Sequence, residues 1–64
     1  MRIYKVHYDV WYGDEPDPDD RDWQQVIAGG MKDAVQRVEK YLKKDRGIKK
    51  FEILDCCLEV EHLL

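Results

Sequence analysis

The chain contains no serine, no threonine and no asparagine among its 64 residues. These absences exclude serine and threonine nucleophiles, phosphorylation by Ser/Thr kinases and N-linked glycosylation. The two cysteines, Cys56 and Cys57, are adjacent, and adjacent cysteines rarely bridge each other because the geometry is strained. A disulfide framework is therefore not expected, and a reducing cytoplasm is the predicted location.

Long apolar runs are also missing. No segment approaches the ~20 consecutive apolar residues that a membrane span needs. Residues 1–5 do not resemble a signal peptide, so we expect no membrane association. A chain of 64 residues predicts a single domain, 1–64. A domain this small buries only about 60% of its unfolded surface, so its stability is marginal and self-association would increase it.

The N-terminal half of the sequence predicts a hairpin. Residues 2–12 alternate with a period of two, which is typical of a strand with one face on a core. Residues 13–21 contain both prolines and a cluster of acidic side chains, which indicates a loop. Residues 22–28 then form a second strand that returns antiparallel to the first. The residues of the first strand expected to face the core are Tyr4, Val6, Tyr8 and Val10.

The C-terminal half predicts a helix and one more strand. Apolar residues recur with helical spacing over residues 31–45, and residues 48–61 are typical of a strand. Phe51 and Ile53 are out of phase with the later apolar residues of this strand. Either a bulge around Leu54–Asp55 changes the strand's phase, or both faces of the sheet are partly apolar.

Together these elements predict an α+β fold with the order β-β-α-β. If the third strand lies beside the first, the sheet is antiparallel with strand order 2-1-3, and the helix covers one face. The opposite face then carries large apolar side chains, which mark interfaces when they are exposed. The alternative is that strand and loop ends of the same chain cover them. The residues predicted for this protein-binding face are Trp11, Trp23, Ile27 and Phe51, with Ile3 and Ile53 beside them.

We expect a partner protein or a second copy on this face. A homodimer would offset the small core, and the polar residues Lys5, His7 and Asp9 predict that the middle of such a contact is polar. The acidic loop is a second candidate for protein binding, through Asp17, Asp19 and Asp20. Its carboxylates could mimic a phosphate backbone. Calcium binding is disfavoured because the spacing lacks the glycine and glutamate of a calcium loop.

A basic cluster follows the predicted helix and gives an alternative function, association with nucleic acid. Such a patch usually accompanies a basic net charge and stacking aromatics, whereas this chain has a net charge of −3. Nucleic acid is therefore the less favoured partner. The cluster consists of Lys43, Lys44, Arg46, Lys49 and Lys50.

Neither catalysis nor metal or cofactor binding is expected. Adjacent cysteines point to opposite faces of a strand and do not match the spacing of a zinc site. Cys57 and His7 could be neighbours across the first and third strands, but this setting offers no cleft and no oxyanion donors. The residues capable of binding a metal are His7, Asp9, Cys56, Cys57 and His62.

The pattern from Trp23 to Ile53 is similar to the β-β-α-β unit of the archaeal LX-type ribosomal proteins, and equally to many short phage-encoded proteins. The residues behind this likeness are those that any such fold uses, and the acidic net charge departs from the ribosomal group, so no family is assigned. The leading prediction is a non-enzymatic protein–protein interaction module. An adaptor or inhibitor role, of the kind that small phage or mobile-element proteins have, would fit it.

Overall fold

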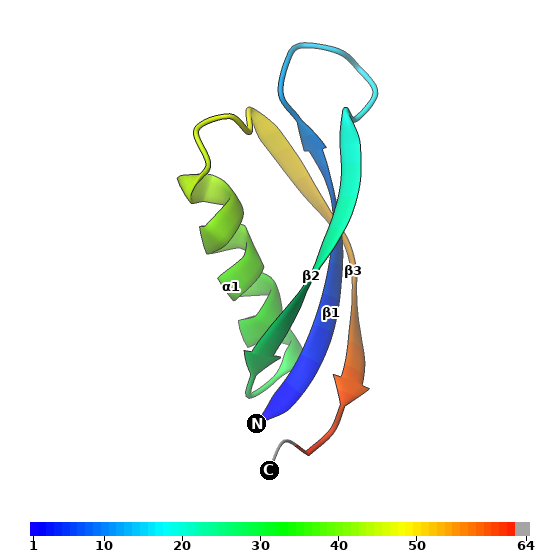
Figure 1. The fold of residues 1–64 in the computed structure, drawn as a ribbon, viewed down its shortest axis with the longest axis vertical. Coiled ribbons are helices and arrows are strands. Elements are labelled where there is room, and N and C mark those ends of the chain that lie inside the picture. The colour runs from blue at the N-terminus through cyan, green and yellow to red at the C-terminus, as the bar shows by residue number, and fades with distance from the viewer. Residues whose placement is uncertain (63–64) are drawn as a thin grey trace.

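The chain folds as two strands, a helix and a third strand, in a computed structural model that describes residues 1–62 (Figure 1). The elements are β1 (Arg2–Trp11), β2 (Asp20–Ala28), α1 (Met31–Lys44) and β3 (Lys50–Val60). Both neighbours of β1 run antiparallel to it, and the sheet order is β2-β1-β3. The predicted α+β class, element order and strand order are confirmed.

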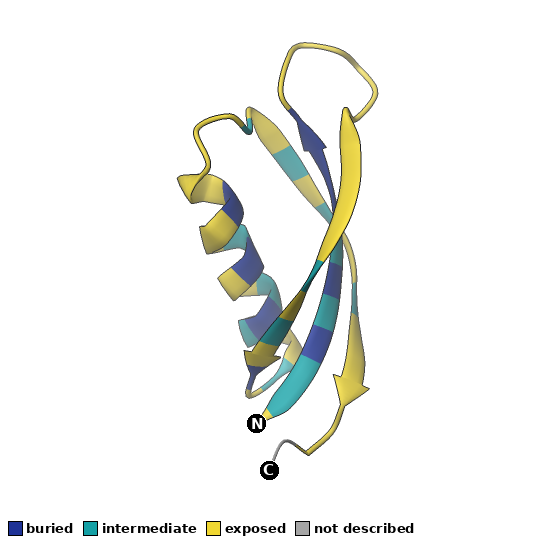
Figure 2. Cartoon of the chain, viewed as in Figure 1, coloured by how far each residue is buried: buried dark blue, intermediate teal, exposed yellow. Residues whose placement is uncertain are grey.

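The core lies between the sheet and α1 (Figure 2). The even-numbered residues of β1 from Tyr4 to Val10 are nearly inaccessible to solvent, and they pack with one stripe of the helix. This arrangement follows from the two periods in the sequence, because a period of two places alternate strand residues on one face and a period of 3.6 makes one helical stripe. The members of this core are Tyr4, Val6, Tyr8, Val10, Ala28, Ala34, Val38 and Leu42.

A bulge in β3 explains the change of phase in the sequence. His7 pairs with Asp55 and Tyr8 pairs with Ile53, so Leu54 is an extra residue on β3; a second register shift near the end of the strand makes Glu59 another. The insertion reverses which residues face the helix, because side chains alternate between the two faces of a strand. Phe51 and Ile53 before the bulge, and Cys56 after it, all pack against the core. Of the two sequence-based alternatives, the bulge is confirmed.

No boundary of a helix or strand differs from the predicted one by more than two residues. The difference that matters for the candidate site is at β2, which starts at Asp20, inside the segment 13–21 predicted as an acidic loop. Asp20 pairs with Val10 and Arg21 pairs with Asp9 across the hairpin. The Arg21–Asp9 ion pair offsets the repulsion among neighbouring carboxylates. The loop between β1 and β2 therefore spans only residues 12–19.

Candidate protein-binding surface

The face of the sheet opposite α1, here called the open face, is formed by the odd-numbered residues of β1 and their neighbours. Directly paired residues of antiparallel strands share a face, so Ile27, Gln25 and Trp23 of β2 lie beside Ile3, Lys5 and His7 of β1. Among residues 1–62, no helix or second sheet lies over this side (Figure 1). Trp23 is 46% exposed and Ile27 is 47% exposed. These two predicted residues are therefore accessible to a partner.

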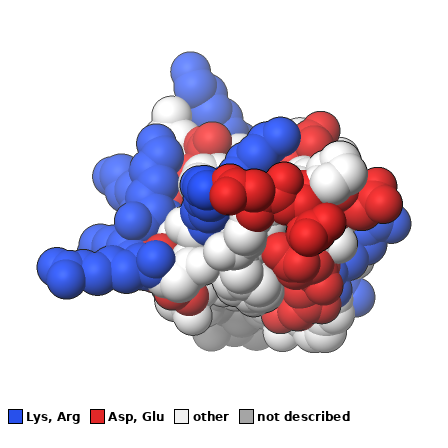
Figure 3. Space-filling view, turned by 90° about the horizontal axis from the view of Figure 1, so that it is seen from above, with Lys and Arg blue, Asp and Glu red and all other residues white. Residues whose placement is uncertain are grey.

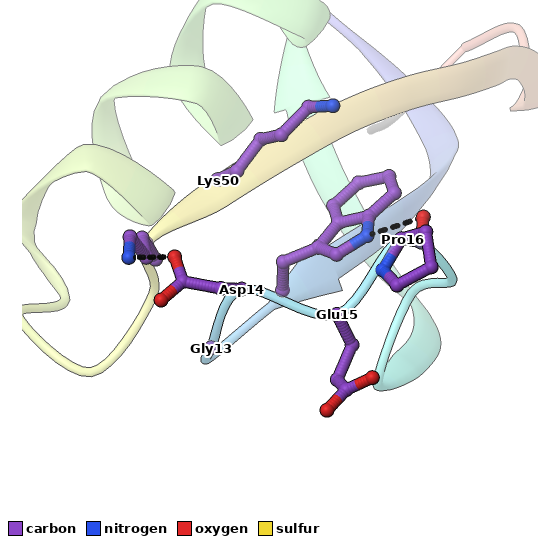
Figure 4. A pocket seen from close by; sticks show the side chains of 7 residues that line it. Gly13, Asp14, Glu15, Pro16 and Lys50 are labelled. Carbon is purple, nitrogen blue, oxygen red and sulfur yellow. Dashed lines mark hydrogen bonds and ion pairs between the residues drawn. The ribbon is translucent and has the colours of Figure 1, made fainter.

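Trp11 differs from the prediction, because it is buried within its own chain and only 7% exposed. Its indole N–H donates to the carbonyl oxygen of Pro16 at 3.3 Å, and Lys50 Nζ lies 4.6 Å from its ring centroid (Figure 4). The hairpin loop and the start of β3 thus cover it. For Trp11, the alternative of intrachain cover is correct, and this residue offers no exposed surface.

Phe51 was also expected on the open face, with Ile53 beside it, and this placement is wrong. Phe51 pairs with the core residue Val10, and both Phe51 and Ile53 pack on the helix side of the sheet. The bulge at Leu54 is the physical reason, because it shifts the phase of the strand by one residue. The exposed apolar part of the open face is therefore centred on β2, at Trp23 and Ile27.

Paired polar side chains occupy the middle of the open face. Lys5 Nζ lies 4.1 Å from the centroid of the Trp23 ring, a distance at which a cation is attracted to the ring face. His7 Nδ1 lies 2.7 Å from Asp55 Oδ1, and Gln25 donates to Glu59 at 2.8 Å. The surface beside Trp23 is therefore polar and already arranged by contacts within the chain.

Asp9 is the buried acid of this face, at 5% exposure. Arg21 donates to both of its carboxylate oxygens, at 2.8 and 3.2 Å. This bidentate hydrogen bonding by Arg21 lowers the pKa of Asp9 below its ordinary value, because it stabilises the ionised form. The Asp9 carboxylate can therefore be buried in its ionised form, because both of its oxygens have a hydrogen-bond partner.

The acidic and basic clusters lie side by side at one end of the elongated molecule, which measures 42 × 19 × 15 Å (Figure 3). The hairpin loop and the turn between α1 and β3 meet at this end (Figure 1). Lys49 and Asp14 form an ion pair between the two segments, and the Lys49 N–H donates to the Trp11 carbonyl at 2.7 Å. One ion pair therefore joins the acidic loop to the basic cluster, and the other charged side chains of the two clusters lie beside each other at this end.

Several predicted residues of the two clusters have contacts within the chain. Asp19 accepts a hydrogen bond from the Tyr12 backbone N–H at 2.7 Å, which closes the hairpin loop. Asp20 accepts from the Arg21 N–H at 2.9 Å, and Asp17 is exposed in the loop. Lys49 and Lys50 contact Asp14 and Trp11 respectively. The remaining basic residues, Lys43, Lys44 and Arg46, are exposed.

An open hollow of about 490 Å³ lies between the two clusters, lined by residues 13–16, Trp11, Lys49 and Lys50 (Figure 4). Trp11 lines it with an indole N–H and a ring face that already contact Pro16 and Lys50. The Lys49–Asp14 ion pair also lines the hollow, so several of its polar groups already have partners within the chain.

Cys57 and His7 lie near each other on the open face, because both contact the same carboxylate oxygen, Asp55 Oδ1, at 3.9 and 2.7 Å. The residue directly paired with Cys57 across the strands is Lys5, whereas His7 pairs with Asp55. Burial raises the pKa of the Cys56 thiol, which makes it a weaker nucleophile. Within residues 1–62, no group of three or more metal-capable side chains comes together, and no helix is long and apolar enough to cross a membrane.

Comparisons with known proteins give no relative for this chain. No protein-family model, no curated protein and no solved structure matches it. Inferences about function therefore depend on the surfaces of the molecule itself.

Proposed function

We propose that this protein is a small, non-enzymatic protein-binding module that binds its partner on the open face, around Trp23 and Ile27. The observation that carries the proposal is that these two large apolar side chains are each nearly half exposed on a face that no described element covers. Tryptophan anchors of this kind are enriched among the residues that dominate binding energy. The partner is another protein, for which the chain acts as an adaptor or an inhibitor.

The polar surroundings of Trp23 support a specific contact over a purely apolar one. Lys5, His7 and Gln25 lie beside it on the same face, and each is already held by a neighbour. A rim of polar groups around an aromatic centre is the usual arrangement of a protein interface. Preformed side-chain contacts also reduce the conformational entropy lost on binding.

Nucleic-acid binding through the basic cluster has less support. Lys49 is paired with Asp14, Lys50 lies over Trp11, and the acidic loop lies beside both. A nucleic-acid backbone approaching this end would meet carboxylates as well as ammonium groups, and it would be repelled by the former.

The test is quantitative affinity capture from host extract with three chains: wild type, Trp23→Asp and Tyr41→Asp. Tyr41 is the matched control, because it is 59% exposed on α1, away from the open face. We expect Trp23→Asp to lose the specific partner by about 30-fold or more, as for a residue that contributes ~2 kcal/mol to binding. Tyr41→Asp should retain it.

Salt separates the proposed function from its alternative. Binding to nucleic acid through Lys43, Lys44 and Arg46 weakens steeply as salt rises, because counterions are released. Retention through Trp23 should change little between low and moderate salt. Equal recovery of the same partners by wild type and Trp23→Asp would contradict the proposal.

A further inference from the structure

The outer edge of β3 has no partner strand within residues 1–62. β1 pairs with one side of β3, and β3 is the last strand of the sheet on that side. The strand is 11 residues long and contains no proline. Edge strands of this kind expose a row of backbone donors and acceptors to which another strand can pair.

The apolar residues on the helix side of β3 are arranged symmetrically about the bulge. Ile53 and Cys56 are the first helix-side residues before and after it, and both pack against the core. Phe51 and Leu58 are the second ones, since they pair with the core residues Val10 and Tyr4. Without the bulge, residues 53 and 56 would lie on opposite faces, because side chains alternate along a strand. The bulge at Leu54 therefore makes the helix-side pattern symmetric over residues 51–58, as far as the second register shift of β3 at Glu59.

This symmetry has a consequence for pairing between two copies. If β3 pairs antiparallel with β3 of a second copy about the bulge, Ile53 lies opposite Cys56 and Phe51 lies opposite Leu58. Each pairing occurs twice, and all four lie on the helix side of one continuous sheet. Leu58, 44% exposed in the single chain, would then gain an aromatic neighbour.

The charges on β3 favour the same arrangement. Lys50 is its first residue and Glu59 lies near its end, with Lys49 and Glu61 directly flanking the strand. Antiparallel pairing brings the basic end of one strand beside the acidic end of the other, and parallel pairing would place like charges together. Pattern and charge thus select one orientation.

We propose that the protein forms a two-fold symmetric homodimer in which β3 pairs antiparallel with β3 of a second copy, centred on the bulge at Leu54. The contact is isologous, so each copy offers the same edge and the assembly closes. It joins two three-stranded sheets into one and adds apolar burial to a domain with a small core. The contact is separate from the open face, so Trp23 stays available to the partner proposed above.

Two matched substitutions test the dimer. Leu58→Asp places a carboxylate opposite Phe51 of the second copy, and Ile27→Asp changes an equally exposed residue, 44% against 47%, on the other edge strand. Light scattering at micromolar concentration should give twice the 7.7 kDa chain mass for wild type and Ile27→Asp, and the single mass for Leu58→Asp. A monomeric wild type would overturn the proposal. A dimer broken by Ile27→Asp but not by Leu58→Asp would also do so, because it would place the contact on the open face.

A disulfide tests the register without weakening the contact. In the proposed pairing, Glu52 lies opposite Cys57 of the second copy, and both are exposed in the single chain. Within one chain, five residues of strand span about 17 Å, far beyond the Cα separation that a disulfide allows.

Mild oxidation should therefore convert Glu52→Cys into a covalent dimer on a non-reducing gel. Wild type and the control Gln25→Cys, exposed on β2, should stay largely monomeric on the same gel. Equal cross-linking of Glu52→Cys and Gln25→Cys would refute this register. Partner capture by Leu58→Asp is scored separately, so failure of the dimer and failure of the open-face proposal give different results.

Discussion

The two faces of β1 are built from the same strand but on different physical principles. On the helix side, Tyr4, Val6, Tyr8 and Val10 are buried among apolar neighbours, and burial of apolar area stabilises them. On the open face, Lys5, His7 and Asp9 are each matched with a specific partner on a neighbouring strand. The helix side is therefore stabilised by apolar packing and the open face by paired polar contacts. Substitutions on the two faces should reduce the free energy of unfolding by different amounts.

The largest effect is expected at the covered face. Leu42→Ala removes a side chain that is 2% exposed at the centre of the core, and such truncations cost about 2–5 kcal/mol. Ile27→Ala, at 47% exposure on the open face, should cost less than about 1 kcal/mol. Urea unfolding followed by circular dichroism measures both. Similar losses for the two variants would show that the open face is also packed in solution.

The two tryptophans give a finer contrast within the open face. Trp11→Ala should cost about 3 kcal/mol, because the loop and Lys50 lose the ring they cover. Trp23→Ala removes a half-exposed ring with one cation contact, so its cost should stay near 1 kcal/mol or below. Thermal melts would rank them. The fluorescence of the Trp11→Ala chain, which reports on Trp23 alone, should be red-shifted relative to that of the Trp23→Ala chain. A smaller loss for Trp11→Ala than for Trp23→Ala would contradict the burial described above.

The smallest effect concerns pH and the pairing of Asp9 with Arg21. Since the pKa of Asp9 is lowered in the folded chain, its ionised form stabilises the protein above the ordinary aspartate pKa of about 3.9. This stabilisation is lost as the pH falls through the lowered value. Asp9→Asn should therefore be less stable than wild type at neutral pH, and the difference should shrink in acid.

Asp17→Asn, in the exposed loop, is the control for a simple change of net charge. Urea midpoints measured from neutral pH to about pH 2, below the ordinary aspartate pKa, would show the trend. A difference for Asp9→Asn that is independent of pH would contradict the role of its charge.

Periodicity was sufficient to predict the fold but not the surface. The alternation of Tyr4 to Val10 and the helical stripe through Ala34, Val38 and Leu42 depend on local spacing, so the sequence alone predicts them. The covering of Trp11 depends on where Pro16 and Lys50 come to lie, and both are positioned by the path of a loop and by long-range pairing. Neither leaves a periodic signal.

Phe51 and Asp20 show two further limits of reading the sequence. The phase of Phe51 was ambiguous, because the same apolar pattern fits a bulged strand or a sheet that is apolar on both faces. Asp20 resembles a loop residue by composition, and its strand conformation comes from pairing with Val10 and from the neighbouring Arg21–Asp9 contact. Of the predicted open-face residues, Trp23 and Ile27 are exposed as expected, whereas Trp11 and Phe51 are not.

The extra residue Leu54 in β3 also makes this part of the chain intolerant of a deletion. Deleting Leu54 would restore alternation as far as Leu58, just before the second register shift at Glu59, so that the residues directly after the deletion would exchange sides. Cys57 would turn toward α1, and Cys56 and Leu58 would turn away from it. A one-residue deletion in the loop of residues 12–19 changes no such parity. The strand therefore needs a residue at position 54 to keep its phase, but it does not need the leucine side chain. Leu54→Ala should be tolerated, whereas deletion of Leu54 should not.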